Sequence, residues 1–370
     1  MNRLTATYRV IANAAEIEAR AAALALEQSV EMPAAAITSE YVREHTLGRV
    51  ARITPLDHQV FRVDLDLSVA TTGFEVGQLM NMLFGNCSLQ DDVQLLDVTL
   101  PAELMRAFPG PRFGITGIRE RLDVPLRALT CSALKPQGLD PTELANLCAT
   151  FARAGIDVIK DDHGIADQIY APFALRVRTC QRALRQVNAE TGHQACYAPS
   201  LSGNPRQLRE QIRIIAGEGV GMVLASPMIM GLPVFHEIVR ETLEVPVLAH
   251  PALSGALRIA PPLFYGKLFR LFGADAVIFP NFGGRFSYSS ETCRALVDAA
   301  RATWGECAPA LPVPAGGMSV ERVPEMIVAY GLDTMLLIGG GLLSAGEQLP
   351  ARCREFVAAV AAASAAVLNI

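Results

Sequence analysis

From about residue 127 onward, short runs of hydrophobic residues alternate with longer segments that carry helical spacing. The hydrophobic runs are nearly continuous, which is typical of strands that are buried on both faces of a parallel sheet. The runs are Ala128–Lys135, Asp157–Asp161, Gln194–Ser200, Gly221–Ser226, Val245–His250, Ala274–Pro280, Leu311–Ala315 and Thr334–Ile338.

Helical stretches lie between these runs, and several of them begin at a proline, which the first turn of a helix tolerates. The stretches are Pro141–Ala154, Pro172–Glu190, Pro205–Glu218, Val234–Leu243, Pro262–Phe272, Ser290–Thr303 and Val320–Tyr330. Eight strand–helix units in about 245 residues match a closed (β/α)₈ barrel of the TIM type. A doubly wound open sheet is the alternative, but the number of units favours the barrel.

The first part of the chain follows a different pattern. Thr5–Ile11 and Val60–Leu67 alternate like half-exposed antiparallel strands, while Ala14–Gln28 and Val76–Phe84 carry helical spacing. This order predicts a small α+β domain of the ferredoxin-like kind, with an antiparallel sheet. A turn-rich connection at residues 108–111 marks the boundary. We therefore expect an N-terminal α+β domain over residues 1–110 and a catalytic α/β barrel over residues 111–370.

Composition narrows the possible functions. Of the 370 residues, 51% are hydrophobic and 19% are charged, and the net charge of −5 gives no support to nucleic-acid binding. The first residues lack the apolar core of a signal peptide, and no apolar stretch is long enough to span a membrane. The eight cysteines show no Cys-x-x-Cys spacing and no zinc pattern, so free thiols in a reducing cytoplasm are expected.

The most informative segment is Gly155–His163, where a short apolar strand ends in Lys160, Asp161, Asp162 and His163. Burying a lysine, two carboxylates and an imidazole together is costly unless they pair or hold a metal ion. In a barrel of parallel strands, the carboxyl ends of the strands are also where catalytic groups gather. The alternative, an internal ion pair at a solvated strand end, stays open from the spacing alone.

Other predicted strands end in a related set of residues. Lys135 and His250 close the first and fifth strands, and the sixth runs into a glycine-rich loop that carries Arg285. Lys135 could simply reach solvent, and His250 could be a hydrogen-bonded core residue. Paired glycines follow the last two strands, where backbone N–H groups can approach a phosphate closely. These are Gly316, Gly317, Gly340 and Gly341. One pair is weak evidence because glycines also form ordinary turns, but two pairs at these positions are stronger.

Taken together, the chain resembles the RuBisCO superfamily, and specifically the RuBisCO-like proteins that do not fix carbon dioxide. The most specific element is Gly-x-Asp-x-x-Lys-Asp-Asp at Gly155–Asp162. The resemblance implies Mg²⁺ bound by Lys160, Asp162 and His163, with Lys160 carboxylated on its amine as a carbamate. His163 stands where the family has glutamate, which softens the site and could favour Mn²⁺ or Zn²⁺.

The resemblance assigns roles to further residues. Lys135 matches a proton-transferring lysine, although Gln137 replaces a second lysine two residues later. His250 matches a strand-five histidine, but Pro251 replaces the adjacent phosphate-contacting arginine, and Arg285 takes the place of a loop lysine. The glycine pairs match the phosphate-binding loops. Groups that a partner subunit donates correspond to Glu27 and Asn86. The resemblance thus implies a homodimer with active sites shared between subunits.

The missing loop lysine and arginine argue against carboxylation and leave machinery for a metal-stabilised enediolate of a phosphorylated sugar or sugar acid. Because the planar guanidinium of Arg285 suits a carboxylate, decarboxylation of 3-oxo-isoapionate 4-phosphate is the first expectation. The runner-up is methionine salvage, as a 5-methylthioribulose 1-phosphate isomerase or a 2,3-diketo-5-methylthiopentyl-1-phosphate enolase. Met228, Ile229 and Met230 could then supply an apolar pocket. A non-catalytic barrel kept for binding is the third possibility.

Overall fold

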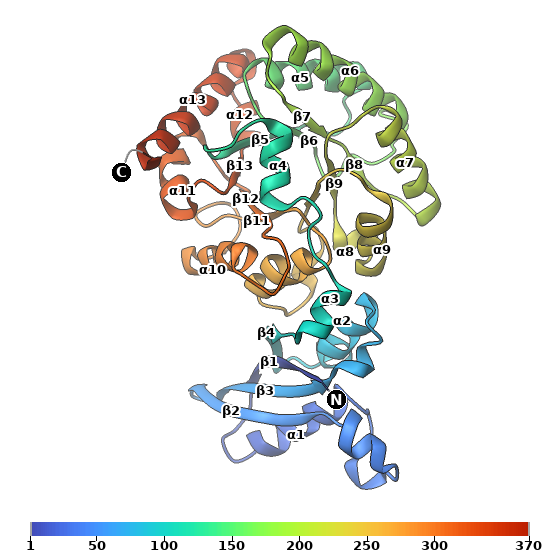
Figure 1. The fold of residues 1–370 in the computed structure, drawn as a ribbon. Helices are drawn as coiled ribbons and strands as arrows, with labels where there is room; N and C mark the ends of the chain where they lie inside the picture. Colours follow the sequence, from blue (N-terminus) through green and yellow to red (C-terminus); the bar gives the residue numbers. More distant parts are fainter. Residues whose placement is uncertain (1, 369–370) are drawn as a thin grey trace. The chain divides into compact units, whose positions relative to one another are not determined.

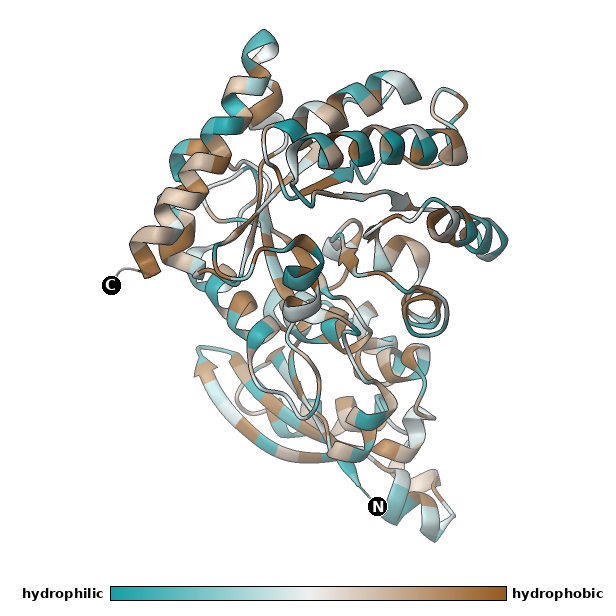
Figure 2. Cartoon of the chain, turned by 45° about the horizontal axis from the view of Figure 1, so that its top comes forward, coloured by the Kyte–Doolittle hydropathy of each residue, from teal (hydrophilic) through white to brown (hydrophobic). Residues whose placement is uncertain are grey.

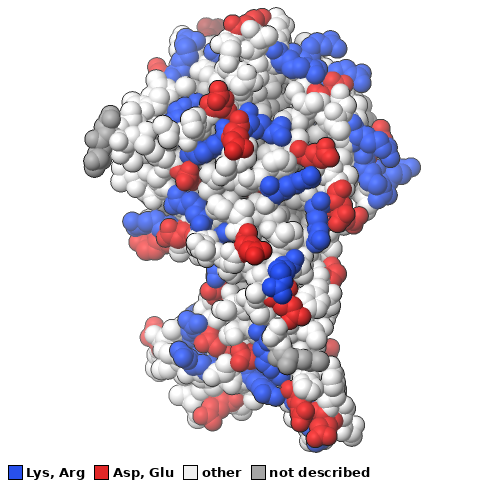
Figure 3. Space-filling model, viewed as in Figure 1, with Lys and Arg blue, Asp and Glu red and all other residues white. Residues whose placement is uncertain are grey.

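The computed structural model describes residues 2–368, which form two compact units. One unit comprises Met1–Pro109 together with Ser254–Phe264, and the other comprises Gly110–Leu253 and Tyr265–Ile370. Over residues 2–368, no helix combines the length and the apolar character that crossing a lipid bilayer requires. Positive and negative side chains are interspersed over the face shown in Figure 3.

The first unit is built on an antiparallel sheet of four strands in the order β2-β3-β1-β4. Along β1, every second residue is fully buried, as a strand with one covered face requires. The elements are β1 (Arg3–Ile11), α1 (Ile17–Glu27), β2 (Arg49–Asp57), β3 (Val60–Ser68), α2 (Val76–Phe84), β4 (Val93–Thr99) and α3 (Ala102–Ala107). The βαββαβ order confirms the predicted α+β domain.

The sequence pattern did not reveal β2 or β4, which are the two outer strands of this sheet. Strand β2 is exposed along most of its length and has two register irregularities, so it lacks a clear alternation. The outer edge of β4 is covered by residues 258–260, because Leu95 N–H donates to the Arg258 carbonyl (3.0 Å) and Ala260 N–H donates to the Leu95 carbonyl (2.8 Å). This pairing explains why Ser254–Phe264 belongs to the first unit, although it lies within the barrel sequence.

The second unit is a parallel barrel, and each strand follows one of the predicted hydrophobic runs. The strands are β5 (Leu129–Leu134), β6 (Val158–Asp161), β7 (Cys196–Ala198), β8 (Ser200–Leu201), β9 (Val223–Ala225), β10 (Val247–Ala249), β11 (Ala276–Pro280), β12 (Leu311–Ala315) and β13 (Met335–Leu337). Strands β7 and β8 correspond to one predicted strand that is interrupted at Pro199, with β7 paired to β6 and β8 paired to β9.

The ring closes between β12 and β13, which lie side by side but share no ladder of backbone hydrogen bonds among the described residues. The reason lies in the sequence of β12. Its odd-numbered residues direct their N–H groups toward β11, as Leu311 N–H does in donating to the Asp275 carbonyl (2.8 Å). Pro312 and Pro314 therefore face β13 without an N–H to donate. The Thr334 hydroxyl instead donates to the Pro312 carbonyl (3.1 Å).

Helices surround the ring of strands, as Figure 1 shows. The principal helices are α5 (Pro141–Arg153), α6 (Phe173–Thr191), α7 (Pro205–Gly217), α9 (Leu232–Glu237), α10 (Ser290–Arg301), α11 (Val323–Tyr330) and α13 (Leu349–Leu368). Asp140 and Asn204 begin α5 and α7 with capping boxes. Figure 2 shows hydrophilic residues recurring along these outer helices among more hydrophobic ones.

Several shorter helices complete the chain, and two predicted α-helices are π-helical over part of their length. The short α-helices are α4 (Gly114–Leu122), α8 (Pro227–Met230) and α12 (Gly340–Leu343). The π-helices are η2 (Val42–Thr46), η5 (Ile238–Thr242) and η7 (Pro262–Phe269), and the 3₁₀ turns are η1 (Ala34–Ala36), η3 (Val69–Thr72), η4 (Asn86–Leu89), η6 (Ser254–Ala256), η8 (Val320–Arg322) and η9 (Gly346–Gln348).

The barrel core lies at the amino-terminal ends of the strands, where Ile115, Ile118 and Leu122 of α4 pack with inward-facing strand residues. On β6, Val158 belongs to this core. Because side chains alternate along a strand, Lys160 also points inward, one layer nearer the carboxyl end. The core thus supports a cationic side chain directly above it.

Candidate active site

Asp161 and Lys160 are adjacent in sequence but face opposite sides of β6. The Asp161 carboxylate accepts hydrogen bonds from Arg176 Nε (3.1 Å), Tyr197 Oη (2.7 Å) and Ser200 N (3.0 Å). The side chains of Asp161 and Arg176 are completely buried, so this ion pair is compensated within the wall of the barrel. Asp161 therefore holds β6 to its neighbours and does not reach the barrel mouth.

Lys160 points into the barrel and is only 3% exposed. Its amine donates to the carbonyl oxygen of Asp161 (2.9 Å), and no carboxylate in residues 2–368 forms an ion pair with it. Burial lowers the pKa of this amine, and the charge of Lys135 acts in the same direction, while Asp162 opposes it. Lys160 is thus an incompletely compensated buried amine.

Asp162 lies just past the end of β6 and joins two other predicted residues. Its Oδ1 is 2.8 Å from Lys135 Nζ and 3.4 Å from His163 Nδ1. Burial alone would raise the pKa of Asp162, but hydrogen bonds from His163 and Lys135 and the charges of both lysines hold it well below its usual value. The carboxylate is therefore ionised, as a metal ligand or a partner for Lys135 must be.

His163 and His250 stack on one another with ring centroids 4.2 Å apart and planes 10° from parallel. The Nδ1 atom of His250 accepts a hydrogen bond from Ala252 N (3.1 Å). Burial lowers the pKa of His250 to about 2, and the charge of Lys160 contributes in the same direction. His250 is consequently neutral near pH 7, with its proton on Nε2, where it can donate to an oxygen atom of a ligand.

Arg285 is placed differently from these residues. Its backbone N–H donates to the Gly316 carbonyl (3.3 Å), and its guanidinium lies over the ring of Phe286, 5.1 Å from the centroid. The loop after β11 thereby packs on the glycine pair after β12. A Cβ atom on Gly317 would come within 2.7 Å of Gly284 Cα, and both glycines of the pair have positive φ angles. Packing and backbone conformation alone thus require glycine at Gly316 and Gly317.

The glycine pair after β13 has a different environment. A Cβ atom on Gly341 would lie 2.8 Å from the Met318 carbonyl oxygen, so close packing accounts for that glycine. At Gly340, no atom lies within 4 Å of the added carbon, and the backbone is not in the left-handed region. Space beside Gly340 therefore remains open for a bound group.

Glu27 and Asn86 belong to the first unit, where they lie next to one another. The Asn86 amide donates to Glu27 Oε1 (2.9 Å) and to Glu31 Oε1 (3.0 Å); Asn86 and Glu31 are exposed, and Glu27 is half-buried. The two residues that the resemblance assigns to a partner's active site therefore form one polar cluster.

Two neighbours of the site were missed in the sequence. Arg176 lies on the buried face of α6, and its position between Phe173 and Val177 in an apolar helical stripe was an available signal. Gln137, which replaces a lysine of the family, has its amide nitrogen where a Cβ atom on Gly164 would lie. The Gln137 side chain of the loop after β5 therefore packs against Gly164 of the loop after β6, next to His163.

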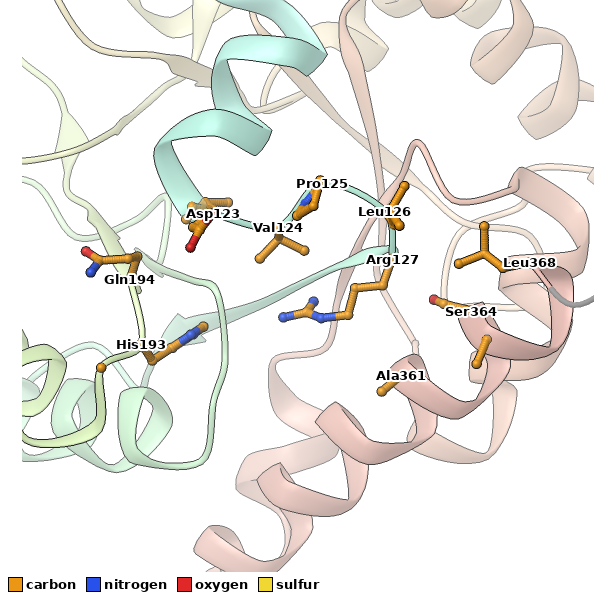
Figure 4. Close-up of a pocket in the computed structure, with 13 residues that line it drawn as sticks. Asp123, Val124, Pro125, Leu126, Arg127, His193, Gln194, Ala361, Ser364 and Leu368 are labelled. Atoms are coloured by element: carbon orange, nitrogen blue, oxygen red, sulfur yellow. The ribbon is translucent and has the colours of Figure 1, made fainter.

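A pocket of about 470 Å³ lies at the opposite end of the barrel, between the segment before β5, the turn before β7 and the end of α13. Figure 4 shows Arg127 and His193 pointing toward one another inside it. Arg127 is bound in a fork by the fully buried Asp157, with two 2.7 Å contacts. None of the sequence-predicted site residues lines this pocket, and the guanidinium of Arg127 is engaged in holding the strands together.

The resemblance implies a divalent cation, and the residues could hold one if the amine of Lys160 is carboxylated. No three of the His, Cys, Asp and Glu side chains in residues 2–368 are grouped to hold a metal. Asp162 Oδ1 and His163 Nδ1 are near enough to share one ion, at 3.4 Å apart. Lys160 becomes an oxygen donor only as a carbamate, and a buried amine of lowered pKa is the form that reacts with carbon dioxide. The set therefore fits a divalent ion if Lys160 is carboxylated.

Comparison with known proteins identifies the family. Residues 114–348, most of the barrel, match the catalytic domain of the ribulose bisphosphate carboxylase large chain. The chain belongs to this family. Enzymes of the RuBisCO family in general use Mg²⁺ and a carbamylated lysine and act on phosphorylated sugars.

Its relatives include RuBisCO-like proteins that are not carboxylases. The chain is 55% identical over 364 residues to the 5-methylthioribulose-1-phosphate isomerase of Rhodospirillum rubrum, covering 98% of this chain and 97% of the relative. It is 33% identical over 366 residues to the 2,3-diketo-5-methylthiopentyl-1-phosphate enolase of Geobacillus kaustophilus, covering 92% and 88%. The crystal structure of the Rubisco-like protein from Rhodopseudomonas palustris has a TM-score of 0.92 at 47% identity and covers 98% of both chains. The chain is thus a non-carboxylating RuBisCO-like protein.

Proposed function

We propose that this RuBisCO-like protein is a 5-methylthioribulose 1-phosphate isomerase. The observation that carries the proposal is the 55% identity to the Rhodospirillum rubrum isomerase along nearly the full length of both chains. The lower identity of 33% to the Geobacillus enolase makes the enolase reaction the second candidate. Both reactions need a base beside a carbonyl group, and the cluster at the end of β6 supports that chemistry.

In the proposed reaction, different residues act as the base, the hydrogen-bond donor, the metal ligands and the phosphate site. Lys135, which Asp162 positions, acts in its neutral amine form: the amine takes a proton from the carbon next to the carbonyl, and the resulting ammonium returns it to a neighbouring carbon. His250 donates its Nε2–H to the oxygen on which negative charge develops. A divalent ion held by Lys160, Asp162 and His163 would stabilise the same charge. The open space beside Gly340 and the glycine turn after β12 receive the phosphate group.

Decarboxylation of 3-oxo-isoapionate 4-phosphate, the first expectation from sequence, has less support. It rested on Arg285 binding a substrate carboxylate and on the resemblance of Lys-Asp-Asp-His-Gly, at residues 160–164, to the RuBisCO-like proteins of apiose breakdown. The guanidinium of Arg285 lies over Phe286, and its backbone is engaged with the Gly316 carbonyl. The relatives at 54% and 55% identity are named a ribulose bisphosphate carboxylase-like protein and a 5-methylthioribulose-1-phosphate isomerase, and those names favour the isomerase reaction.

Turnover separates these reactions directly. The purified protein with Mg²⁺ and bicarbonate is supplied with 5-methylthioribulose 1-phosphate, and the products are followed by ³¹P and ¹H NMR. We expect an isomeric sugar phosphate with no release of carbon dioxide. Turnover of the 3-oxo acid phosphate with carbon dioxide release, and none of the thioether sugar, would support the decarboxylase. Binding of both without turnover would support a non-catalytic barrel.

We also propose a cytoplasmic homodimer in which Glu27 and Asn86 of one copy complete the site of the other. All eight cysteines are free and buried, which suits a reducing compartment. On its own unit Asn86 is exposed, and the Glu27 carboxylate that it binds is partly accessible to solvent. Mixing inactive Glu27→Ala and inactive Lys160→Ala chains should restore about a quarter of the activity through hybrid dimers. A monomer that is fully active at all concentrations would contradict the shared site.

A further inference from the structure

The loop after β9 is unusual for the catalytic end of a barrel. Residues 227–235 contain no polar or charged side chain, whereas the loops after β5, β6 and β11 carry Lys135, His163 and Arg285. Ile229 is 59% exposed, and Met228 and Met230 beside it are partly exposed. Within this segment, the side chains of Met228, Ile229 and Met230 in the helical turn α8 reach solvent, and exposed apolar side chains at the mouth of a barrel suit the binding of an apolar group.

The order of the strands fixes where this loop lies relative to the rest of the site. Counting around the ring in either direction, β9 is four strands away from β13. In an eight-stranded barrel that separation is the maximum, so α8 and Gly340 lie on opposite sides of the mouth. Strand β6, which carries Lys160, lies two strands from each of them.

His250 is next to the apolar loop. Its backbone N–H donates to the Ala225 carbonyl (2.8 Å), at the residue where β9 ends and two residues before α8 begins. A ligand whose oxygen accepts from His250 Nε2 therefore has α8 beside it on one side and the cluster of Lys135 and Asp162 on the other. The polar side chains of the site therefore lie between Gly340 and the apolar residues of α8.

We propose that Met228, Ile229 and Met230 form a subsite for the apolar end of an amphipathic sugar phosphate that spans the mouth of the barrel. This inference rests on the proposed function and specifies its substrate class: a phosphate at one end, vicinal oxygens in the middle and an uncharged thioether or alkyl group at the other end. Methionine and isoleucine side chains offer soft, polarisable contacts to such a group and cannot replace the hydrogen bonds of a hydroxyl. The loop thus selects against ordinary polar sugar phosphates.

The experiment compares two unreactive probes of similar length, 5-(methylthio)pentyl phosphate and 5-hydroxypentyl phosphate, by isothermal titration calorimetry. Wild-type protein should bind the thioether probe about 10-fold or more tightly than the hydroxyl probe, the discrimination that one small apolar group provides. In Ile229→Asn the preference should fall below about 3-fold, with the affinity for the hydroxyl probe nearly unchanged. Ile229→Ala should show an intermediate loss.

The matched control is Leu126→Asn, because Leu126 is an apolar residue of similar exposure (63%) at the opposite end of the barrel. It should leave the preference unchanged. Equal affinities for the two probes in the wild type, or an undiminished preference in both Ile229 variants, would overturn the subsite. A preference that is lost in Ile229→Asn supports the subsite even if the protein fails to isomerise 5-methylthioribulose 1-phosphate, in which case only the proposed reaction falls.

Discussion

The buried charged side chains Asp157 and Lys160, at the two ends of strand β6, differ in whether they have a charged partner. Just before the strand, Asp157 is completely buried and accepts hydrogen bonds from Arg127 (2.7 Å), the Thr130 hydroxyl (2.8 Å) and the Thr130 backbone N–H (2.8 Å). At the other end, Lys160 is almost as deeply buried but has only a backbone carbonyl as its partner. Asp157 thus fastens neighbouring strands, as Asp161 does in the barrel wall, whereas the inward-facing Lys160 has no carboxylate partner in residues 2–368.

The same contrast extends around the barrel. At the amino-terminal end, the Asp275 carboxylate accepts from the backbone N–H groups of Phe113 (2.7 Å), Gly114 (2.8 Å) and Val247 (2.9 Å), so the segment before α4 is tied to two strands. At the carboxyl end, Asp162 pairs with Lys135 (2.8 Å), and no carboxylate in residues 2–368 pairs with Lys160. A site that leaves buried charges incompletely paired lowers stability in exchange for reactivity, as functional sites commonly do.

The largest effect is expected from Lys160→Met. Activity should fall by at least about 1,000-fold, because both the carbamate and the cation it would hold are lost. Stability should stay the same or rise by about 1 kcal/mol, since a buried amine with a pKa lowered by burial is replaced by an apolar side chain. Steady-state kinetics and urea unfolding on the same preparation test both parts. If Lys160→Met were active and less stable than the wild type, Lys160 would stabilise the fold and would not take part in the reaction.

Lys135→Ala should reduce kcat by about 100- to 10,000-fold, the usual contribution of a positioned acid or base. Because Lys135 is one-third exposed, the fold should tolerate the change. Binding of an unreactive phosphate ligand should weaken far less than kcat, which calorimetry can measure. Equal losses in kcat and in ligand affinity would instead assign Lys135 to binding.

At the amino-terminal end of β6, Asp157→Ala should lower stability and leave activity nearly unchanged. Removing the carboxylate leaves Arg127 without its partner and two Thr130 donors unsatisfied, so the free energy of unfolding should fall by about 3 kcal/mol. The kcat per folded molecule should change less than 3-fold, a bound set by the separation of stabilising and catalytic ends. Chemical denaturation and active-site titration distinguish these quantities. Loss of activity at full stability would contradict the comparison.

At the carboxyl end of the barrel, Gly340→Ala and Gly341→Ala separate an effect on phosphate binding from an effect on stability. At Gly340 the added methyl group enters open space, so stability should hold while KM for a phosphorylated substrate rises about 10-fold, as expected for one displaced phosphate contact. At Gly341 the methyl group meets the Met318 carbonyl oxygen, and stability should fall instead. Thermal unfolding and steady-state kinetics separate the two. Unchanged KM in Gly340→Ala would place the phosphate elsewhere.

The smallest effect concerns the thiols in the barrel wall. Burial raises the pKa of Cys131 to about 12 and that of Cys196 to about 11. At pH 8 these thiols are therefore almost entirely protonated, and they should react with iodoacetamide far more slowly than in urea-unfolded protein. Mass spectrometry of labelled protein measures the difference. Rapid labelling of Cys131 in the native state would show that the barrel opens.

Much of the fold could be predicted because barrel strands buried on both faces read as continuous apolar runs. The outer strand β2 escaped notice, since its exposed residues and Pro55 leave no alternation to recognise. Sequence alone also does not show which way a side chain faces, so Asp161 and Asp162 look equivalent in it. Only strand geometry shows that Asp161 faces Arg176 in the barrel wall, whereas Asp162 meets Lys135 at the mouth.

The substrate was harder to predict than the reacting groups. The motif at residues 155–162 predicts where a cation would bind, but under the proposed function the far end of the substrate meets rim loops whose residues have no fixed spacing to that motif. Arg285 suggested a carboxylate while it was considered alone, because its packing on Phe286 cannot be read from sequence. The strand order around the ring was needed to place Ile229 opposite Gly340.

The most direct test of the account is whether Lys160 takes up carbon dioxide. The protein is equilibrated with ¹³C-labelled bicarbonate and Mg²⁺, and ¹³C NMR is used to look for a protein-bound carbamate. The account predicts one carbamate signal that strengthens with Mg²⁺ and is absent in Lys160→Met. A metal-dependent isomerase activity in the complete absence of that signal would contradict it.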